Sequence, residues 1–408
     1  MESQLRYSLI TLGFDVSRRC NMACNFCSRG KPEEADLGYD IIDKTLDQIQ
    51  RKNVYVSSVR LGGGEPFLTP GVISYIVDGI IRRRLRVGEM CVFTNGSIRN
   101  PVIRDALIRT ADYLASNPDL VKRPKEIRNL ITPKYDGICD GTVDVIISED
   151  GHPQFEGKDQ TIEYYSGKRP NINVSLQSVS THNQTGTHGL ILQGRAVENI
   201  ETLIGDKLLP NTLIKGNDNR YCFMEHIGDM IWFYKSVTVS TNGNVFIGCL
   251  RPFYRVDHES DFNIADGDLF TYLESYCWSH PITSRMNFIR ETKQAYDICR
   301  KHGIDLSEQD TLVRLYDAVD IMISMYERIC KQLHEKYLRF SPQHIMLMGA
   351  IILIEQLKDV HKDYPAEKIT RLLFDETYSP YIIGKLITPH GRQQLINEIE
   401  NDLAPWER

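Results

Sequence analysis

Residues 9–27 read LITLGFDVSRRCNMACNFC, an apolar run followed at once by three closely spaced cysteines. The run from Ile10 to Val16 predicts a buried strand. Cys20, Cys24 and Cys27 then fall within eight residues, where one loop can wrap around an inorganic cluster. Thiolates are the standard ligands of iron–sulfur clusters, and three of them on four irons leave one iron for a reactive cofactor. We therefore predict a 4Fe-4S cluster on these cysteines.

Structural zinc is the alternative for clustered cysteines, but it requires four tetrahedral ligands. The next cysteine, Cys91, lies in a predicted buried strand, and the nearest histidine is His152. Ligand number and spacing therefore favour the iron–sulfur cluster.

From Leu9 to about Gly205, strand-like runs alternate with amphipathic stretches, a pattern typical of βα units around a parallel sheet. The later strand-like runs are Ser58–Leu61, Met90–Thr94, Val143–Ser148, Ile172–Gln177 and Gly189–Leu192. Apolar residues repeat at helical spacing between them, at Ile42, Leu46 and Ile49 and at Ile73, Ile76, Val77 and Ile80. We predict an α/β fold, a partial (β/α)6 TIM-type barrel with right-handed crossovers over residues 1–205.

The rest of the chain divides by composition. Three prolines make 117–141 an irregular insertion within the barrel. Residues 206–280 predict a small strand-rich module, with a hairpin turn at Thr241-Asn242-Gly243-Asn244. Residues 281–408 predict a helical appendage, with an apolar helix face from Leu312 to Leu333 and a capping box at Ser307 and Asp310.

Bulk properties narrow the function classes. The net charge of −6 argues against non-specific nucleic-acid binding, although the basic run Lys122–Lys134 is either a solvated loop or a substrate contact. The longest apolar run, Ile345–Ile354, is about half of the roughly 20 residues of a spanning helix, so we expect no membrane partner. The N-terminus lacks a signal-peptide pattern, and the dispersed cysteines do not resemble a disulfide scaffold. We expect a cytoplasmic protein.

The Cys-x3-Cys-x2-Cys spacing, with Phe26 before the last cysteine, resembles the signature of the radical S-adenosylmethionine (SAM) superfamily. Gly63-Gly64-Glu65-Pro66 resembles that family's motif for the amino group of SAM, and Thr94-Asn95-Gly96 resembles its third-strand motif. On physical grounds, glycines at a strand end permit close backbone approach, and a carboxylate can pair with an ammonium group. All three motifs follow consecutive predicted strands, so we expect them to converge at the carboxyl ends of those strands.

The resemblance implies an oxidoreductase-type radical enzyme with a 4Fe-4S cluster and SAM as cofactors. Its SAM contacts would be Phe26, Gly63, Gly64, Glu65, Pro66, Asn95 and Ser148, the last from Ile147–Gly151, which is similar to a segment of the peptide- and protein-modifying branch. That branch implies a peptide or protein substrate and an electron donor such as a flavodoxin or ferredoxin. Where the branch carries an arginine after this segment, only Lys158 and Gln160 lie nearby.

Residues 237–275 resemble the SPASM or twitch extension of the same branch, and Gly194-Arg195-Ala196 resembles its junction with the barrel. The module of residues 206–280 that contains it is depleted in cysteine, because only Cys222, Cys249 and Cys277 occur there. Either they hold a second cluster or they are small buried residues.

Other functions stay open. One is radical modification of a nucleotide, RNA or small metabolite, and another is a non-catalytic iron–sulfur scaffold or redox sensor. Glu149, Asp150 and Cys222 are each candidates for a general acid, a general base or a radical-relay residue, and their spacing favours none of them.

Overall fold

A computed structural model describes most of the barrel region and parts of the remaining chain. The described residues are 5–24, 27, 31–128, 140–148, 157–177, 199, 224–227, 230–247, 262–279, 319–336, 342–360, 370 and 380–400. The chain forms two compact units. The first comprises Met1–Asn211 with Met224–Tyr272, and the second comprises Thr212–Phe223 with Leu273–Arg408.

One sheet organises the first unit, with strand order β5-β4-β3-β2-β1-β7-β6 and β8 paired to β7. Its strands are β1 Tyr7–Ser17, β2 Tyr55–Gly63, β3 Arg86–Thr94, β4 Val143–Ser148, β5 Ile172–Gln177, β6 Met224–Ile227, β7 Met230–Val239 and β8 Val245–Ile247. Strands β1 to β5 and β7 pair in parallel, whereas β6 and β8 are antiparallel to β7. The α/β prediction and its first five strands are confirmed. The barrel is not closed within the described residues, and Gly189–Leu192 lies outside them.

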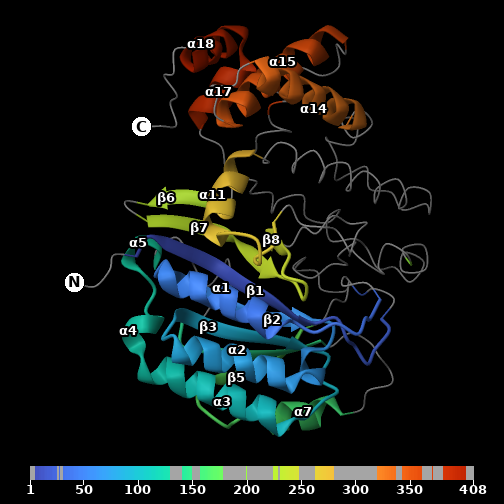
Figure 1. The fold of residues 1–408 in the computed structure, drawn as a ribbon, viewed down its shortest axis with the longest axis vertical. Coiled ribbons are helices and arrows are strands. Elements are labelled where there is room, and N and C mark those ends of the chain that lie inside the picture. Colours follow the sequence, from blue (N-terminus) through green and yellow to red (C-terminus); the bar gives the residue numbers. More distant parts are fainter. Residues whose placement is uncertain are drawn as a thin grey trace. The chain divides into compact units, whose positions relative to one another are not determined.

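The parallel order places the carboxyl ends of β1, β2 and β3 side by side. Helices α1 Tyr39–Arg51, α2 Pro70–Arg82 and α3 Pro101–Ser116 cover one face of the sheet (Figure 1). Their apolar residues at helical spacing are buried, among them Ile42, Leu46, Ile73 and Ile76. Proline begins α2 and α3, where its missing N–H costs nothing. The loop that leaves each strand therefore emerges at the same edge of the sheet.

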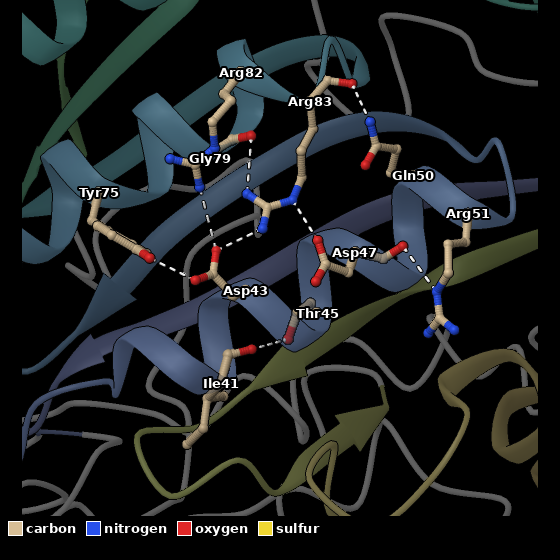
Figure 2. A network of polar contacts seen from close by, with 10 residues as sticks. All are labelled: Ile41, Asp43, Thr45, Asp47, Gln50, Arg51, Tyr75, Gly79, Arg82 and Arg83. Carbon is tan, nitrogen blue, oxygen red and sulfur yellow. Dashed lines mark hydrogen bonds and ion pairs between the residues drawn. The ribbon is translucent and has the colours of Figure 1, made fainter.

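Charged residues fasten α1 to α2 (Figure 2). The Tyr75 hydroxyl donates to the Asp43 carboxylate at 2.6 Å. Arg83, just after α2, donates to Asp43 at 2.6 Å and to Asp47 at 2.7 Å. The Arg83 side chain is only 9% exposed, so one guanidinium bridges two carboxylates of the neighbouring helix.

The insertion contains two short helices, α4 Pro118–Val121 and α5 Lys125–Arg128, and its residues 129–139 lie outside the described part. The Tyr55 hydroxyl, at the start of β2, donates to the Val121 carbonyl at 3.0 Å. Arg123 is buried and donates to Asp140 at 2.9 Å, whereas Lys122 and Lys125 are exposed. The basic run is therefore partly internal, and it packs at the amino end of β2, away from the motifs.

The hairpin predicted around Asn242-Gly243 is confirmed between β7 and β8, and Gly243 has the positive φ of +86° that such a turn requires. Its strands continue the main sheet, because β7 pairs with β1. Gln48 of α1 connects to the start of helix α11, Leu269–Ser279, since the Leu269 N–H donates to its side-chain oxygen at 2.6 Å. The proposed boundaries at 205 and 280 stay a prediction.

The second unit is helical where it is described, with α14 Val319–Lys336, α15 Pro342–Val360, α17 Pro380–Ile387 and α18 Pro389–Glu400. The apolar run Ile345–Ile354 lies in α15, and its buried residues include Leu347, Met348, Ala350, Ile351, Leu353 and Ile354. The predicted capping box lies outside the described residues. No helix in the described ranges has the length and apolar character needed to cross a membrane.

Candidate functional site

The cysteine loop is closed at its base by hydrogen bonds. The Arg18 N–H donates to the Ala35 carbonyl at 2.7 Å, and the Glu33 N–H donates to the Arg18 carbonyl at 3.1 Å. Asp36 accepts from the Ser17 hydroxyl at 2.7 Å and pairs with Arg19. The segment that carries the three thiols therefore begins and ends at the carboxyl end of β1.

The glycines after β2 pack directly against this loop. The Gly64 N–H donates to the Ser17 carbonyl at 2.6 Å, and the Glu65 N–H donates to the Arg19 carbonyl at 2.7 Å. A Cβ at Gly63 would lie 2.3 Å from the Ser17 oxygen, and one at Gly64 would lie 2.2 Å from the Arg19 oxygen. Gly63 also has φ +129°. Glycine is required here because two backbone segments meet, whatever ligand binds nearby.

Glu65 is fully buried and joins β2 to β3. Its Oε1 accepts from the Phe67 N–H at 3.0 Å and from the Thr94 hydroxyl at 2.7 Å. Its Oε2 accepts from the Asn95 N–H at 2.6 Å. Burial raises the pKa of this carboxyl to about 7, although the three donors oppose the shift. Pro66 is buried next to it and begins the 3-10 turn η1, Pro66–Leu68.

Asn95 joins β3 to the cysteine loop through a ring of three side chains. Asn95 Nδ2 donates to Asn21 Oδ1 at 2.9 Å, and Asn21 Nδ2 donates to Ser97 Oγ at 2.9 Å. The Ser97 hydroxyl closes the ring by donating to Asn95 Oδ1 at 2.6 Å. Asn21 lies inside the cysteine run, so the first and third motifs are in direct contact.

All three cysteines of the loop are partly exposed, and none of them is in a disulfide. The Cys27 N–H donates to the Cys24 carbonyl at 3.3 Å. Burial raises the pKa of the Cys20 thiol, and nearby Glu65 and Cys27 raise it further. Hydrogen bonds from the Met22 backbone and the Asn95 side chain lower it. Cys20 therefore lies within electrostatic range of Cys27 and of the other two motifs.

Within the part of the chain that is described, no three His, Cys, Asp or Glu side chains are already gathered as a ligand set. The donor chemistry nevertheless fits an iron–sulfur cluster, because three cysteines that are not in disulfides share one loop. Cys91 is buried in β3 with its pKa raised to about 12 by burial, so it is not a further ligand of this loop.

The structure brings together most of the predicted site residues. Ser148 is exposed at the end of β4, the strand next to β3. Phe26, Glu149, Asp150, Gly194–Ala196, Cys222 and Cys249 lie outside the described residues, as does the side chain of Cys277. Asn21 and Ser97 were missed by sequence reasoning. Their only signal is position, since one lies between two cysteines and the other follows an Asn-Gly turn.

Comparison with known proteins gives one short sequence match. No protein-family model matches the chain. Two curated proteins named GTP 3′,8-cyclase, from Clostridium perfringens strains SM101 and 13, are each 26% identical over 99 residues. The match covers 23% of this chain and 29% of theirs, so the chain spans less than a third of the relatives' length.

Three solved structures are similar in part. The complex of BtrN with AdoMet and 2-DOIA has a TM-score of 0.38 and 13% identity, over 72% of this chain and 92% of BtrN. Streptococcus suis SuiB bound to the precursor peptide SuiA has a TM-score of 0.34 and 12% identity, over 67% of this chain and 65% of SuiB. Native anSMEcpe with bound AdoMet and Cp18Cys peptide has a TM-score of 0.37 and 14% identity, over 69% of this chain and 84% of anSMEcpe.

Proposed function

We propose that this chain is a radical SAM enzyme. The observation that carries the proposal is the hydrogen-bonded convergence of three motifs, from Asn21 of the cysteine loop through Asn95 to Glu65, at the carboxyl ends of β1, β2 and β3. Active sites of parallel barrels lie at this edge. Both curated relatives are radical SAM enzymes, and the match to them over 99 residues supports the proposal.

When bound, a 4Fe-4S cluster and SAM would supply one-electron reductive cleavage of SAM and hydrogen-atom abstraction from a substrate. The protein's task is to hold and orient these groups. Cys20, Cys24 and Cys27 would hold the cluster, on a loop whose base is fastened to Gly64 and Glu65.

Phe26, Gly63–Pro66, Asn95 and Ser148 stay our proposed SAM contacts. Glu65 would act through its backbone carbonyl, because its carboxylate already accepts three hydrogen bonds inside the protein and its N–H donates to the Arg19 carbonyl. Its side chain instead holds the end of β3, and with it Asn95, against the glycine segment. Asn95 in turn holds the cysteine loop through Asn21.

The test is anaerobic reconstitution with iron and sulfide, followed by dithionite and SAM without substrate. We expect 5′-deoxyadenosine and a cluster absorption band. Replacing Cys20, Cys24 and Cys27 together by alanine should abolish both. Cys330→Ala, a partly exposed cysteine of the second unit, is the matched control and should retain both. An alanine triple variant that keeps its iron, or a wild type that makes no 5′-deoxyadenosine above background, would contradict the proposal.

For the substrate we propose a peptide or protein, supported by the likeness of Ser148 and of the β7–β8 hairpin to the peptide-modifying branch. A nucleotide is the second candidate, favoured by the match to GTP 3′,8-cyclase. Incubation of the reduced enzyme with GTP, followed by mass spectrometry of the nucleotide, separates the two. We also propose a flavodoxin or ferredoxin as electron donor and the cytoplasm as compartment.

A further inference from the structure

A row of polar residues crosses the sheet on the face away from the helices. Parallel register aligns Gly13 of β1, Arg60 of β2, Cys91 of β3, Asp144 of β4 and Asn173 of β5. Registered neighbours in a parallel sheet point to the same face, and successive residues of a strand alternate. Cys91 and Met90 are adjacent and therefore face opposite sides, and Met90 accepts from the Thr110 hydroxyl of α3. We call the face that carries Arg60, Cys91, Asp144 and Asn173 the inner face.

Arg60 is a partly buried cation of the inner face. Its Nε lies 3.5 Å from the Ser58 hydroxyl, and no carboxylate of the described residues forms an ion pair with its guanidinium. Gly62 follows it on the same face and adds no side chain between Arg60 and the motif at the end of β2. A guanidinium that is withdrawn from water and unpaired costs free energy, which an incoming anion recovers.

Asp144 presents the opposite charge in the same row. Its carboxylate accepts from the Asn173 amide at 2.9 Å and from the Thr142 hydroxyl at 3.0 Å, and it has no cation partner in the part of the chain that is described. Strand β3 separates it from Arg60, so the two backbones lie roughly 9–10 Å apart at two strand spacings. The register places Arg60 and Asp144 on the strands on either side of Cys91. Burial raises the pKa of this thiol most, Arg60 lowers it, and Glu89 and Asp144 raise it.

We propose that the inner face binds a peptide segment with two opposite charges, its carboxylate on Arg60 and its cationic side chain on Asp144. This inference rests on the proposed function and gives its substrate class. A guanidinium forms strong paired hydrogen bonds with a carboxylate, and Asp144 attracts an ammonium or guanidinium group. A nucleoside triphosphate fits less well, because it carries several negative charges and no cationic group for Asp144.

The experiment is a charge-swap cycle on the reconstituted full chain. Calorimetry measures the affinity of three acetylated and amidated tetrapeptides, Lys-Gly-Gly-Glu, Lys-Gly-Gly-Gln and Gln-Gly-Gly-Glu, and of GTP. Wild type should prefer the doubly charged peptide over either singly charged one by about tenfold to a hundredfold, the range of a charge-assisted hydrogen bond. Arg60→Gln should remove the preference for Glu over Gln and keep the preference for Lys. Asp144→Asn should do the reverse.

Controls separate this result from damage to the fold. Arg60→Lys should keep most of the preference for Glu, and Arg169→Gln, which removes an exposed ion pair with Asp112, should change no preference. The inference is overturned if wild type shows no preference, if Arg60→Gln weakens all peptides equally, or if GTP binds through Arg60 and the peptides do not. A peptide preference in a protein that cannot cleave SAM would overturn only the proposed enzyme.

Discussion

The buried carboxyl of Glu65 gives the sharpest prediction, a pH dependence of stability that one substitution removes. The pKa rises from 4.5 in the unfolded chain to about 7 in the folded one. Between these values the unfolded chain has released its proton while the folded chain still holds it. The unfolded state therefore binds fewer protons, and stability falls as pH rises through this window.

The magnitude follows from the shift. A difference of about 2.5 pK units corresponds to about 3 kcal/mol, and no discount for solvent screening applies because Glu65 is 0% exposed. The free energy of unfolding of wild type, measured by urea without added iron, should drop by about this amount between pH 4.5 and 8. Glu65→Gln keeps the shape and cannot ionise, so this component should vanish.

The control is Glu126→Gln, an exposed carboxylate of α5, which should keep the wild-type pH dependence. Hydrogen exchange of the Asn95 amide gives a local measurement, because that N–H donates to Glu65. Parallel stability curves for wild type and Glu65→Gln across this pH range would refute the reasoning.

Three further changes test the packing around the site. Gly64→Ala places a Cβ 2.2 Å from the Arg19 carbonyl oxygen, so we expect several kcal/mol of destabilisation and loss of iron after reconstitution, measured by urea titration and iron assay. Asn21→Ala removes two hydrogen bonds and should cost roughly 1–2 kcal/mol and shift the cluster's electron-resonance spectrum; an unchanged spectrum would contradict its positioning role. Arg83→Ala should lower the free energy of unfolding in urea by roughly 1–2 kcal/mol, a value discounted because both partner carboxylates are partly exposed, and Arg82→Ala, at a side chain 59% exposed, should change it little.

The local pattern of the sequence was enough to place the strands that carry the motifs. Buried parallel strands are short apolar runs, and Val143–Ser148 and Ile172–Gln177 have the predicted bounds. The pairing of β7 with β1 was not predictable in this way, because it joins residues more than two hundred positions apart. Alternation within a strand states which residues share a face, but not which strand comes next to it.

The chemistry of the site divides in the same way. Residue type and spacing alone singled out Cys20, Cys24, Cys27 and the glycine run, because thiol clustering and the lack of a Cβ are properties of the residues themselves. Only the tertiary structure decided that Glu65 faces inward and that Asn21 contacts Asn95. The residues that bury the Glu65 carboxyl and donate hydrogen bonds to it include some from a strand distant in sequence. They set its pKa, and they leave it less able to bind a ligand.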